Sequence, residues 1–369
     1  MASAIITGAL LYTLHKTGLS LWPAQRAFAN VRWWTLGAYL ATFWAVSFFR
    51  ASRWRFLLRS FADVPFSRVL MASWVGFAGI LLFPFRMGEI VRPYMIREKG
   101  RVSITRATGS VVGERVVDGL LLTLVLAIAL LTVETRNAGT HAIAGLPPMV
   151  TVNYVRHASF VMLGVFTSAF VVIAAYYFAR DFAERFTMRV FGIVSPKLGH
   201  KVADTAKKLA DGLHFLSRGR DALPFIAETL IYWGLNALGM WLLGWGCGLV
   251  HADGTAMTFG EACAIMGTLG VAILIPGPPF LLGTFQTGII AGLGLYFGDE
   301  VLRGAGLAYA SLLFATQFMW TMLAGGVSLA LDKRGMLALR EAEESLAADS
   351  VPPSEAGEEP PASLHTAAE

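Results

Sequence analysis

The sequence reads Pro84-Phe85-Arg86-Met87-Gly88-Glu89-Ile90-Val91-Arg92-Pro93 where a long apolar run breaks, and Glu114-Arg115-Val116-Val117-Asp118 where another begins. Charge is scarce in the apolar parts of this chain. Yet here arginine and glutamate stand close together beside proline and glycine, which do not continue a helix well. We expect the rest of the chain to be organised around these two segments.

These charges have two interpretations. In one, Arg86 and Arg92 are the positive residues that mark the cytoplasmic end of a span. Glu114 and Asp118 then form a polar face at the start of a helix, where carboxylates suit the helix dipole. In the other, proline and glycine break a helix at membrane depth and the charges line a polar site. The spacing alone leaves both open.

The composition is that of a membrane protein. Of 369 residues, 55% are hydrophobic and 15% are charged, whereas a soluble domain carries about 25% charged residues. The mean hydropathy is +0.58. The two cysteines, Cys247 and Cys263, both lie in apolar segments, as small packing residues do. We therefore expect an all-α polytopic membrane protein.

The hydropathy pattern predicts about six full spans and two re-entrant helical hairpins. A membrane-spanning helix needs roughly 20 apolar residues. The predicted spans lie within residues 2–22, 33–49, 107–133, 158–179, 223–250 and 304–331, and the predicted hairpins lie within residues 69–96 and 262–298.

The first hairpin is inferred from the distribution of basic residues. Residues 69–85 form an apolar run with five Lys or Arg residues before it, at positions 50–68, and six after it, at positions 86–106. Cytoplasmic loops are enriched in Lys and Arg, so both flanks belong on the cytoplasmic side. A segment that enters the membrane, breaks and returns satisfies both flanks.

The second hairpin is inferred from length. Residues 262–298 are uncharged for 37 positions. As one helix they would extend for roughly 55 Å, far beyond a bilayer core of about 30 Å. Pro276-Gly277-Pro278-Pro279 marks the expected break, and the lack of charge at both ends suits a hairpin that enters from outside.

We expect one transmembrane domain, residues 1–334, followed by a disordered acidic cytoplasmic tail, residues 335–369. Its halves, about residues 1–134 and 158–334, contain the same series of spans and hairpin but begin on opposite sides of the membrane. In transporters, the broken helices of such inverted repeats meet at the substrate site. The basic loop at residues 180–221 is expected in the cytoplasm, either as a solvated connector or as an amphipathic helix near anionic lipids.

The charged segments resemble a known signature. Arg86-x-Gly88-Glu89-x-x-Arg92, followed by Ser110-Val111-Val112-x-Glu114-Arg115-x-x-Asp118, is similar to the pattern of the lysylphosphatidylglycerol synthase transmembrane-region family. That family includes the lipid-flipping domain of MprF and many stand-alone flippase-like proteins. The similarity extends from about residue 50 to about residue 331.

The second predicted break resembles the family as well. Pro276-Gly277 followed by Gly283-Thr284-Phe285-Gln286 is similar to its Pro-Gly-x-Gly-x-x-Glu loop. Two departures matter: residues 278–282 change the usual spacing, and Gln286 stands where an acid is common. A glutamine still donates and accepts hydrogen bonds but carries no negative charge.

The resemblance implies movement of a phospholipid or a lipid-linked phosphate between the leaflets of a bacterial cytoplasmic membrane, with both termini cytoplasmic. Arginine forks grip phosphate bidentately, while nearby carboxylates would pair with the arginines or contact a cationic headgroup. The two glycines would let backbone approach the substrate. The expected substrate-binding residues are Arg86, Gly88, Glu89, Arg92, Glu114, Arg115, Asp118, Pro276, Gly283 and Gln286.

Motifs for other chemistry are absent from the sequence. It contains no GxxxxGK, GxSxG, HExxH or CxxC motif, and its seven His residues lack metal-ligand spacing. We expect no enzyme activity, cofactor, metal or nucleic-acid partner, while a homo-oligomer remains open. Two other functions also remain open: an accessory membrane subunit whose charges form structural ion pairs, and a membrane-embedded transferase with a prenyl-phosphate donor.

Topology provides the first test. Because basic loops stay inside, we expect Arg55, Arg97, Lys207 and the tail on the cytoplasmic side, and Ala144 and Asp253 outside. Single cysteines introduced at these sites report their sidedness through a membrane-impermeant thiol reagent. External labelling at position 97 would contradict the first re-entrant hairpin.

Overall fold

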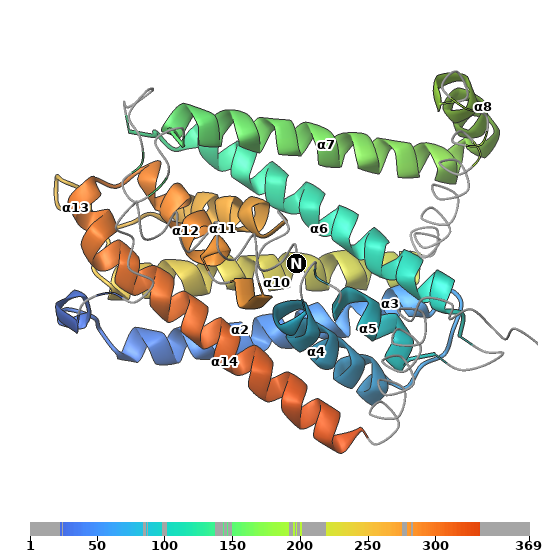
Figure 1. Cartoon of the computed structure of the whole chain (residues 1–369), viewed down its shortest axis with the longest axis horizontal. Coiled ribbons are helices and arrows are strands. Elements are labelled where there is room, and N and C mark those ends of the chain that lie inside the picture. Colours follow the sequence, from blue (N-terminus) through green and yellow to red (C-terminus); the bar gives the residue numbers. More distant parts are fainter. Residues whose placement is uncertain are drawn as a thin grey trace, which may run out of the picture.

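The computed structural model is a bundle of helices (Figure 1). It describes residues 25–83, 88–97, 102–136, 150–191, 219–274 and 283–332, together with residues 23, 86, 143, 146, 195, 197, 200 and 279–281. No strand occurs within these residues, so the expected all-helical class is confirmed for the described chain. The elements are η1 (Gln25–Phe28), α2 (Trp34–Ser52), α3 (Trp54–Leu58), α4 (Phe66–Leu82), α5 (Gly88–Met95), α6 (Ile104–Thr132), α7 (Val152–Phe178), α8 (Arg180–Phe191), α10 (Gly219–Gly246), α11 (Phe259–Leu274), η4 (Pro279–Leu281), α12 (Thr284–Gly294), α13 (Asp299–Val301), η5 (Leu302–Gly306) and α14 (Leu307–Leu331).

Several expectations fall outside the described residues. They concern the first span, within residues 2–22, most of the basic loop, at residues 192–218, the tail at residues 335–369, and Pro276.

Long apolar helices define the class of the protein. Within the described chain, four helical segments are long and apolar enough to cross a membrane: Ile104–Thr132, Val152–Tyr176, Gly219–Gly246 and Asp299–Leu331. Such helices satisfy their own backbone hydrogen bonds, as a bilayer requires. The chain is therefore a multi-pass helical membrane protein.

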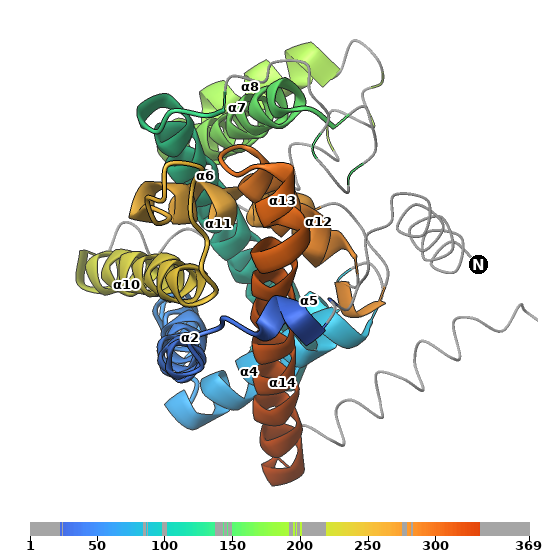
Figure 2. The same ribbon diagram turned by 90° about the vertical axis from the view of Figure 1, so that its left-hand side faces the viewer.

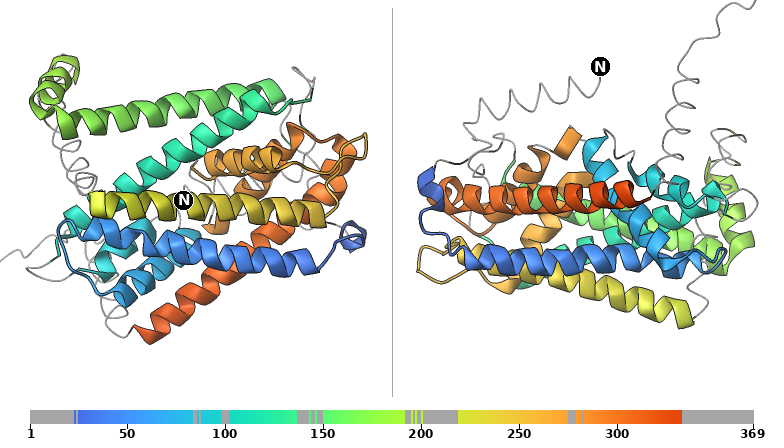
Figure 3. Two further views of the ribbon diagram at one scale, coloured as in Figure 1. Left: turned by 180° about the vertical axis from the view of Figure 1, so that it is seen from behind. Right: turned by 90° about the horizontal axis from the view of Figure 1, so that it is seen from below.

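The helices α2 and α10 lie side by side and antiparallel (Figure 3). The amide of Arg32, just before α2, donates to the carbonyl of Gly246 at the end of α10, at 2.9 Å. Small residues permit the close contact, because a Cβ at Gly239 or Gly246 would overlap Thr42 or Thr35 of α2. The pair forms one side of the bundle.

On another side, α6 lies between α11 and α7 (Figure 2). A Cβ at Gly270 of α11 would overlap Leu122 of α6, and a Cβ at Gly119 of α6 would overlap Phe166 of α7. Only 6% of the most apolar stretch of α7 is buried within the described protein. Most of the α7 surface is therefore not covered by the described part of the protein.

Two pairs of consecutive helices form helical hairpins. In each pair, α4 with α5 and α11 with α12, the second helix folds back along the first. In the first pair, Gly88 lies so close to α4 that a Cβ would overlap the backbone of Gly79 and Ile80. In the second pair, Gly288 and Gly292 face α11 in the same way. Glycines four residues apart commonly allow membrane helices to pack this closely.

These two pairs enter the bundle from opposite ends (Figure 1). At the end that holds α3, Arg68 near the start of α4 donates to the carbonyl of Met95 at the end of α5, at 3.2 Å. At the end that holds α13, the amide of Arg136 after α6 donates to the carbonyl of Leu295, directly after α12, at 2.8 Å. We name these ends the α3 end and the α13 end.

Replacing Gly88 with alanine tests the first pair. We expect Gly88→Ala to lower the melting temperature of the purified protein, because the added Cβ overlaps the α4 backbone and overpacking costs about 1–3 kcal/mol. The control is Gly37→Ala on α2, where nothing lies within 4 Å of the added Cβ. Equal melting temperatures for the two variants would show that α4 and α5 do not approach this closely.

Candidate functional site

A buried ion-pair network joins the end of α2 to α6. The Arg53 guanidinium donates to both carboxylate oxygens of Asp118, at 2.7 Å from Nη1 to Oδ1 and 2.6 Å from Nη2 to Oδ2. Its Nη2 also donates to Oε1 of Glu114 at 3.0 Å. The side chains of Arg53 and Glu114 are both 0% exposed. Because a buried carboxylate is stable only when it is paired, this contact fixes α2 against α6.

Arg92 of α5 reaches the same network from the other side. Its Nη2 lies 3.1 Å from Oε2 of Glu114, and its guanidinium lies 4.4 Å from the ring centroid of Trp54. The aliphatic part of the side chain fills the space that a Cβ at Gly76 would need. Arg92 is fully enclosed, so it holds α5 against α6 and does not face open space.

The tips of the two helix pairs meet inside the bundle. Arg86, at the tip between α4 and α5, donates from Nη1 to the carbonyl of Ile273 on α11 at 3.1 Å. Its Nη2 lies 3.1 Å from Oε1 of Glu89. The non-glycine residues with positive φ in the described chain are Arg86 (58°), Phe280 (64°) and Leu281 (55°), all of them at these tips. Such backbone strain concentrates at functional sites.

Gly283 and Gln286 build the start of α12. The amide of Gly283 donates to Oε1 of Gln286 at 2.8 Å. Gly283 has a φ of 80°, in the left-handed region that favours glycine. Gln286 is buried, and its amide oxygen satisfies a backbone donor that the helix itself leaves free. This role needs an acceptor but no negative charge.

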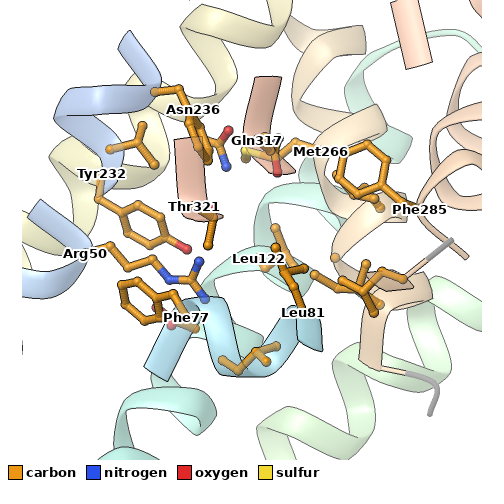
Figure 4. Close-up of a pocket in the computed structure, with 18 of the residues that line it drawn as sticks. Arg50, Phe77, Leu81, Leu122, Tyr232, Asn236, Met266, Phe285, Gln317 and Thr321 are labelled. Atoms are coloured by element: carbon orange, nitrogen blue, oxygen red, sulfur yellow. The ribbon is translucent and has the colours of Figure 1, made fainter. Parts of the chain in front are cut away.

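A cavity of about 180 Å³ lies between the hairpin tips and the long helices (Figure 4). Its charged lining residues are Arg50, Arg86, Arg115 and Asp118. Uncharged polar groups come from Tyr232, Trp233, Asn236, Gln317 and Thr321, and the aromatic wall includes Phe77, Phe285, Phe314 and Phe318. The cavity therefore combines positive charge with a largely apolar and aromatic lining.

Arg50 reaches this cavity from α2, next to Phe77 and Tyr232 (Figure 4). Its guanidinium lies 4.2 Å from the ring centroid of Phe77. The pattern of basic residues had assigned Arg50 and Arg53 to a cytoplasmic flank, and that assignment is wrong for both: Arg53 is fully buried and Arg50 lines the cavity. The available signal was two arginines three residues apart at the end of an apolar helix, followed by Trp54.

The predicted site residues fall into groups according to what they contact. Arg86, Arg115 and Asp118 line the cavity, Glu89, Arg92 and Glu114 form ion pairs beside it, Gly88, Gly283 and Gln286 shape the hairpin tips, and Pro276 lies outside the described residues. The described chain contains no group of three or more His, Cys, Asp or Glu side chains that could hold a metal ion.

Comparison with protein families identifies the family of this sequence. A family model described as Lysylphosphatidylglycerol synthase TM region matches residues 1–326. The match confirms the resemblance seen in the charged segments, and it begins well before residue 50, where the motif similarity starts. Neither the curated proteins nor the solved structures contain a match to this chain.

Removing Arg53 tests the ion-pair network. We expect Arg53→Ala to destabilise the protein by about 3–5 kcal/mol, because buried Asp118 loses its bidentate partner and, in the described chain, keeps only Arg115 as a cationic partner, at 3.5 Å. The control is Arg59→Ala, since the Arg59 side chain is 53% exposed and its contact with Asp221 spans 3.7 Å. An exposed pair contributes about 0–1 kcal/mol. Thermal unfolding in detergent should separate the two variants, and matching curves would contradict a structural role for Arg53.

Proposed function

Because the chain belongs to the lysylphosphatidylglycerol synthase transmembrane-region family, we propose that it moves a phospholipid or a lipid-linked phosphate between the leaflets of the cytoplasmic membrane. The observation that carries this proposal is the cavity between the two hairpin tips. It offers arginines for a phosphate and aromatic side chains for hydrocarbon, the two parts of an amphiphilic lipid.

The proposed membrane arrangement follows from helix length and charge. The four long apolar segments cross the bilayer. With its 19 residues, α2 extends about 28 Å and also crosses, while the predicted N-terminal span would make six. The pairs α4–α5 and α11–α12 are re-entrant hairpins of an inverted repeat. The α3 end is cytoplasmic, since it holds Arg55, Arg59 and Arg97, whereas residues 251–258 at the α13 end contain no Lys or Arg.

In this arrangement the cavity lies inside the membrane, where a lipid headgroup needs partners to replace water. Arg86 and Arg115 bind the phosphate, and the aromatic wall contacts the first part of the hydrocarbon chains. A volume of about 180 Å³ holds on the order of ten water molecules. That space suits a headgroup and is too small for a whole lipid. We propose that the headgroup crosses through the cavity while the chains stay in the bilayer.

The short helix α8 supports the cytoplasmic assignment of the α3 end. Phe182, Phe186 and Val190 form an exposed stripe along α8, and Arg185 and Arg189 are exposed beside it. Amphipathic helices of this kind lie in the membrane interface, with aromatic residues in the acyl boundary and arginines near anionic headgroups. We propose that α8 anchors the described part of the basic loop in this way.

The structural alternative has an observation in its favour. Arg53 and Arg92 are fully enclosed and paired with carboxylates, as they would be in an accessory subunit without transport activity. That explanation does not account for Arg50, Arg86 and Arg115, which line open space. A prenyl-phosphate transferase would use the same cavity, and the assay described next separates it from a flippase.

We expect the purified protein to translocate a fluorescent phosphate-bearing lipid in liposomes, measured with a membrane-impermeant quencher. Arg86→Lys should slow this transport by about tenfold or more. Lysine keeps the charge but cannot reproduce the planar fork, and a lost charge-assisted hydrogen bond is worth about 1.5–3 kcal/mol. Arg97→Lys is the control, because Arg97 is exposed at the α3 end.

Each contrary result points to a different explanation. Full transport by Arg86→Lys would show that Arg86 does not bind the phosphate in the proposed way. No translocation of any headgroup by the wild-type protein would contradict a flippase. A new lipid product formed without translocation would support the transferase.

A further inference from the structure

The charges around the cavity do not balance. We define the charged cluster as the ionisable residues that line the cavity together with all residues connected to them, directly or through one another, by ion pairs: Arg50, Arg53, Arg86, Arg92, Arg115, Glu89, Glu114 and Asp118. Five guanidinium groups face three carboxylates, so the cluster carries a net charge of +2. The neighbouring pair of Arg55 and Glu228 is neutral and does not change this balance.

Three ion pairs account for all the carboxylates. Asp118 is held bidentately by Arg53. Glu114 pairs with Arg92 through its second oxygen at 3.1 Å. At the hairpin tip Glu89 pairs with Arg86, also at 3.1 Å. These pairs leave two arginines in surplus.

The surplus charges belong to Arg115 and Arg50. Arg115 only shares carboxylates that are already paired, at 2.8 Å to Glu114 and 3.5 Å to Asp118. Arg50 has no carboxylate within 4.0 Å in the described chain, and its guanidinium lies over the ring of Phe77. Both line the cavity, so the unbalanced charge faces the space that a ligand would occupy.

An arginine cannot lose its charge by deprotonation in a protein. Uncompensated charge in a medium of low dielectric constant is costly, so an anion inside this cavity would be strongly favoured. A phosphodiester carries one negative charge and would leave half of the surplus uncompensated. A phosphate monoester carries close to two negative charges at neutral pH, since its second pKa is about 6. A headgroup with two negative charges matches the surplus.

We infer that the cavity selects a lipid whose headgroup carries at least two negative charges, a phosphate monoester or a diphosphate, with Arg50 and Arg115 as its counter-charges. The inference rests on the proposed function in one respect, that the ligand is a lipid. The aromatic side chains of Phe285, Phe314 and Phe318, which also line the cavity, contact its hydrocarbon. Lipids with zwitterionic or cationic headgroups bind more weakly because of the same charge surplus.

Binding measured by native mass spectrometry of the detergent-solubilised full chain tests this inference. The probes are geranylgeranyl monophosphate, geranylgeranyl diphosphate, phosphatidylglycerol and phosphatidylcholine. We expect both prenyl phosphates to bind at least about tenfold more tightly than phosphatidylglycerol. Phosphatidylcholine should bind more weakly still.

Two substitutions at Arg50 separate charge from folding. Arg50→Gln should reduce affinity for the prenyl phosphates by about tenfold and bring the preference over phosphatidylglycerol close to one. Arg50→Lys should keep most of the preference, because the charge remains. Arg97→Gln, at an exposed arginine, should leave every affinity unchanged. Melting temperatures of all variants identify any loss that comes from unfolding.

The outcomes distinguish this inference from the proposed function. Equal affinity for monoanionic and dianionic lipids, or a full preference in Arg50→Gln, would overturn the inference. If inorganic pyrophosphate competes as strongly as the prenyl diphosphate, the claim that the ligand is a lipid would be overturned. If the charge preference holds but liposomes show no translocation, the flippase proposal fails and the inference stands. If every headgroup is translocated without preference, the flippase proposal stands and the inference about headgroup charge fails.

Discussion

The arrangement of this protein depends on the ion pairs that Arg53 makes with Glu114 and Asp118. Two carboxylates in the interior of an apolar bundle are stable only with cationic partners, and the charged atoms of Arg53 reach both. The same arginine donates to Thr229 of α10 at 3.0 Å. One side chain therefore connects the end of α2 to both α6 and α10, and the cavity opens next to this contact.

The second constraint is the meeting of the hairpin tips. Neither α4–α5 nor α11–α12 extends through the whole bundle, so each leaves a helix end inside it. Those ends need hydrogen-bond partners, because no water is available in a bilayer core. Arg86 supplies one partner by donating to the carbonyl of Ile273, and Gln286 supplies another by accepting from Gly283. The tight turns at the tips also strain the backbone, since Arg86, Phe280 and Leu281 have positive φ angles there.

The arginines divide into two kinds by their surroundings. Arg53 and Arg92 are enclosed by protein and matched by carboxylates, which makes them part of the framework. Arg50, Arg86 and Arg115 have guanidinium groups at the cavity wall. A stable framework beside a positively charged cavity wall would suit the proposed transport of anionic headgroups, since the site would hold its shape when it is empty. The adjoining aromatic side chains would give the chain of the proposed lipid a matching environment.

The sequence by itself determined the helical membrane class, the family, the two breaks and three of the charged residues that line the cavity. These properties are local: hydrophobic length, scarce charge and helix-breaking residues can be read along a single segment. Only the tertiary structure decided which arginines face inward. Arg53 and its carboxylates lie 61 and 65 positions apart along the chain, and such pairs form only when packing brings their helices together. The local signal for Arg50 and Arg53, two arginines three residues apart at the end of an apolar helix, is also the pattern of a cytoplasmic flank. Only the fold therefore places Arg50 at the cavity.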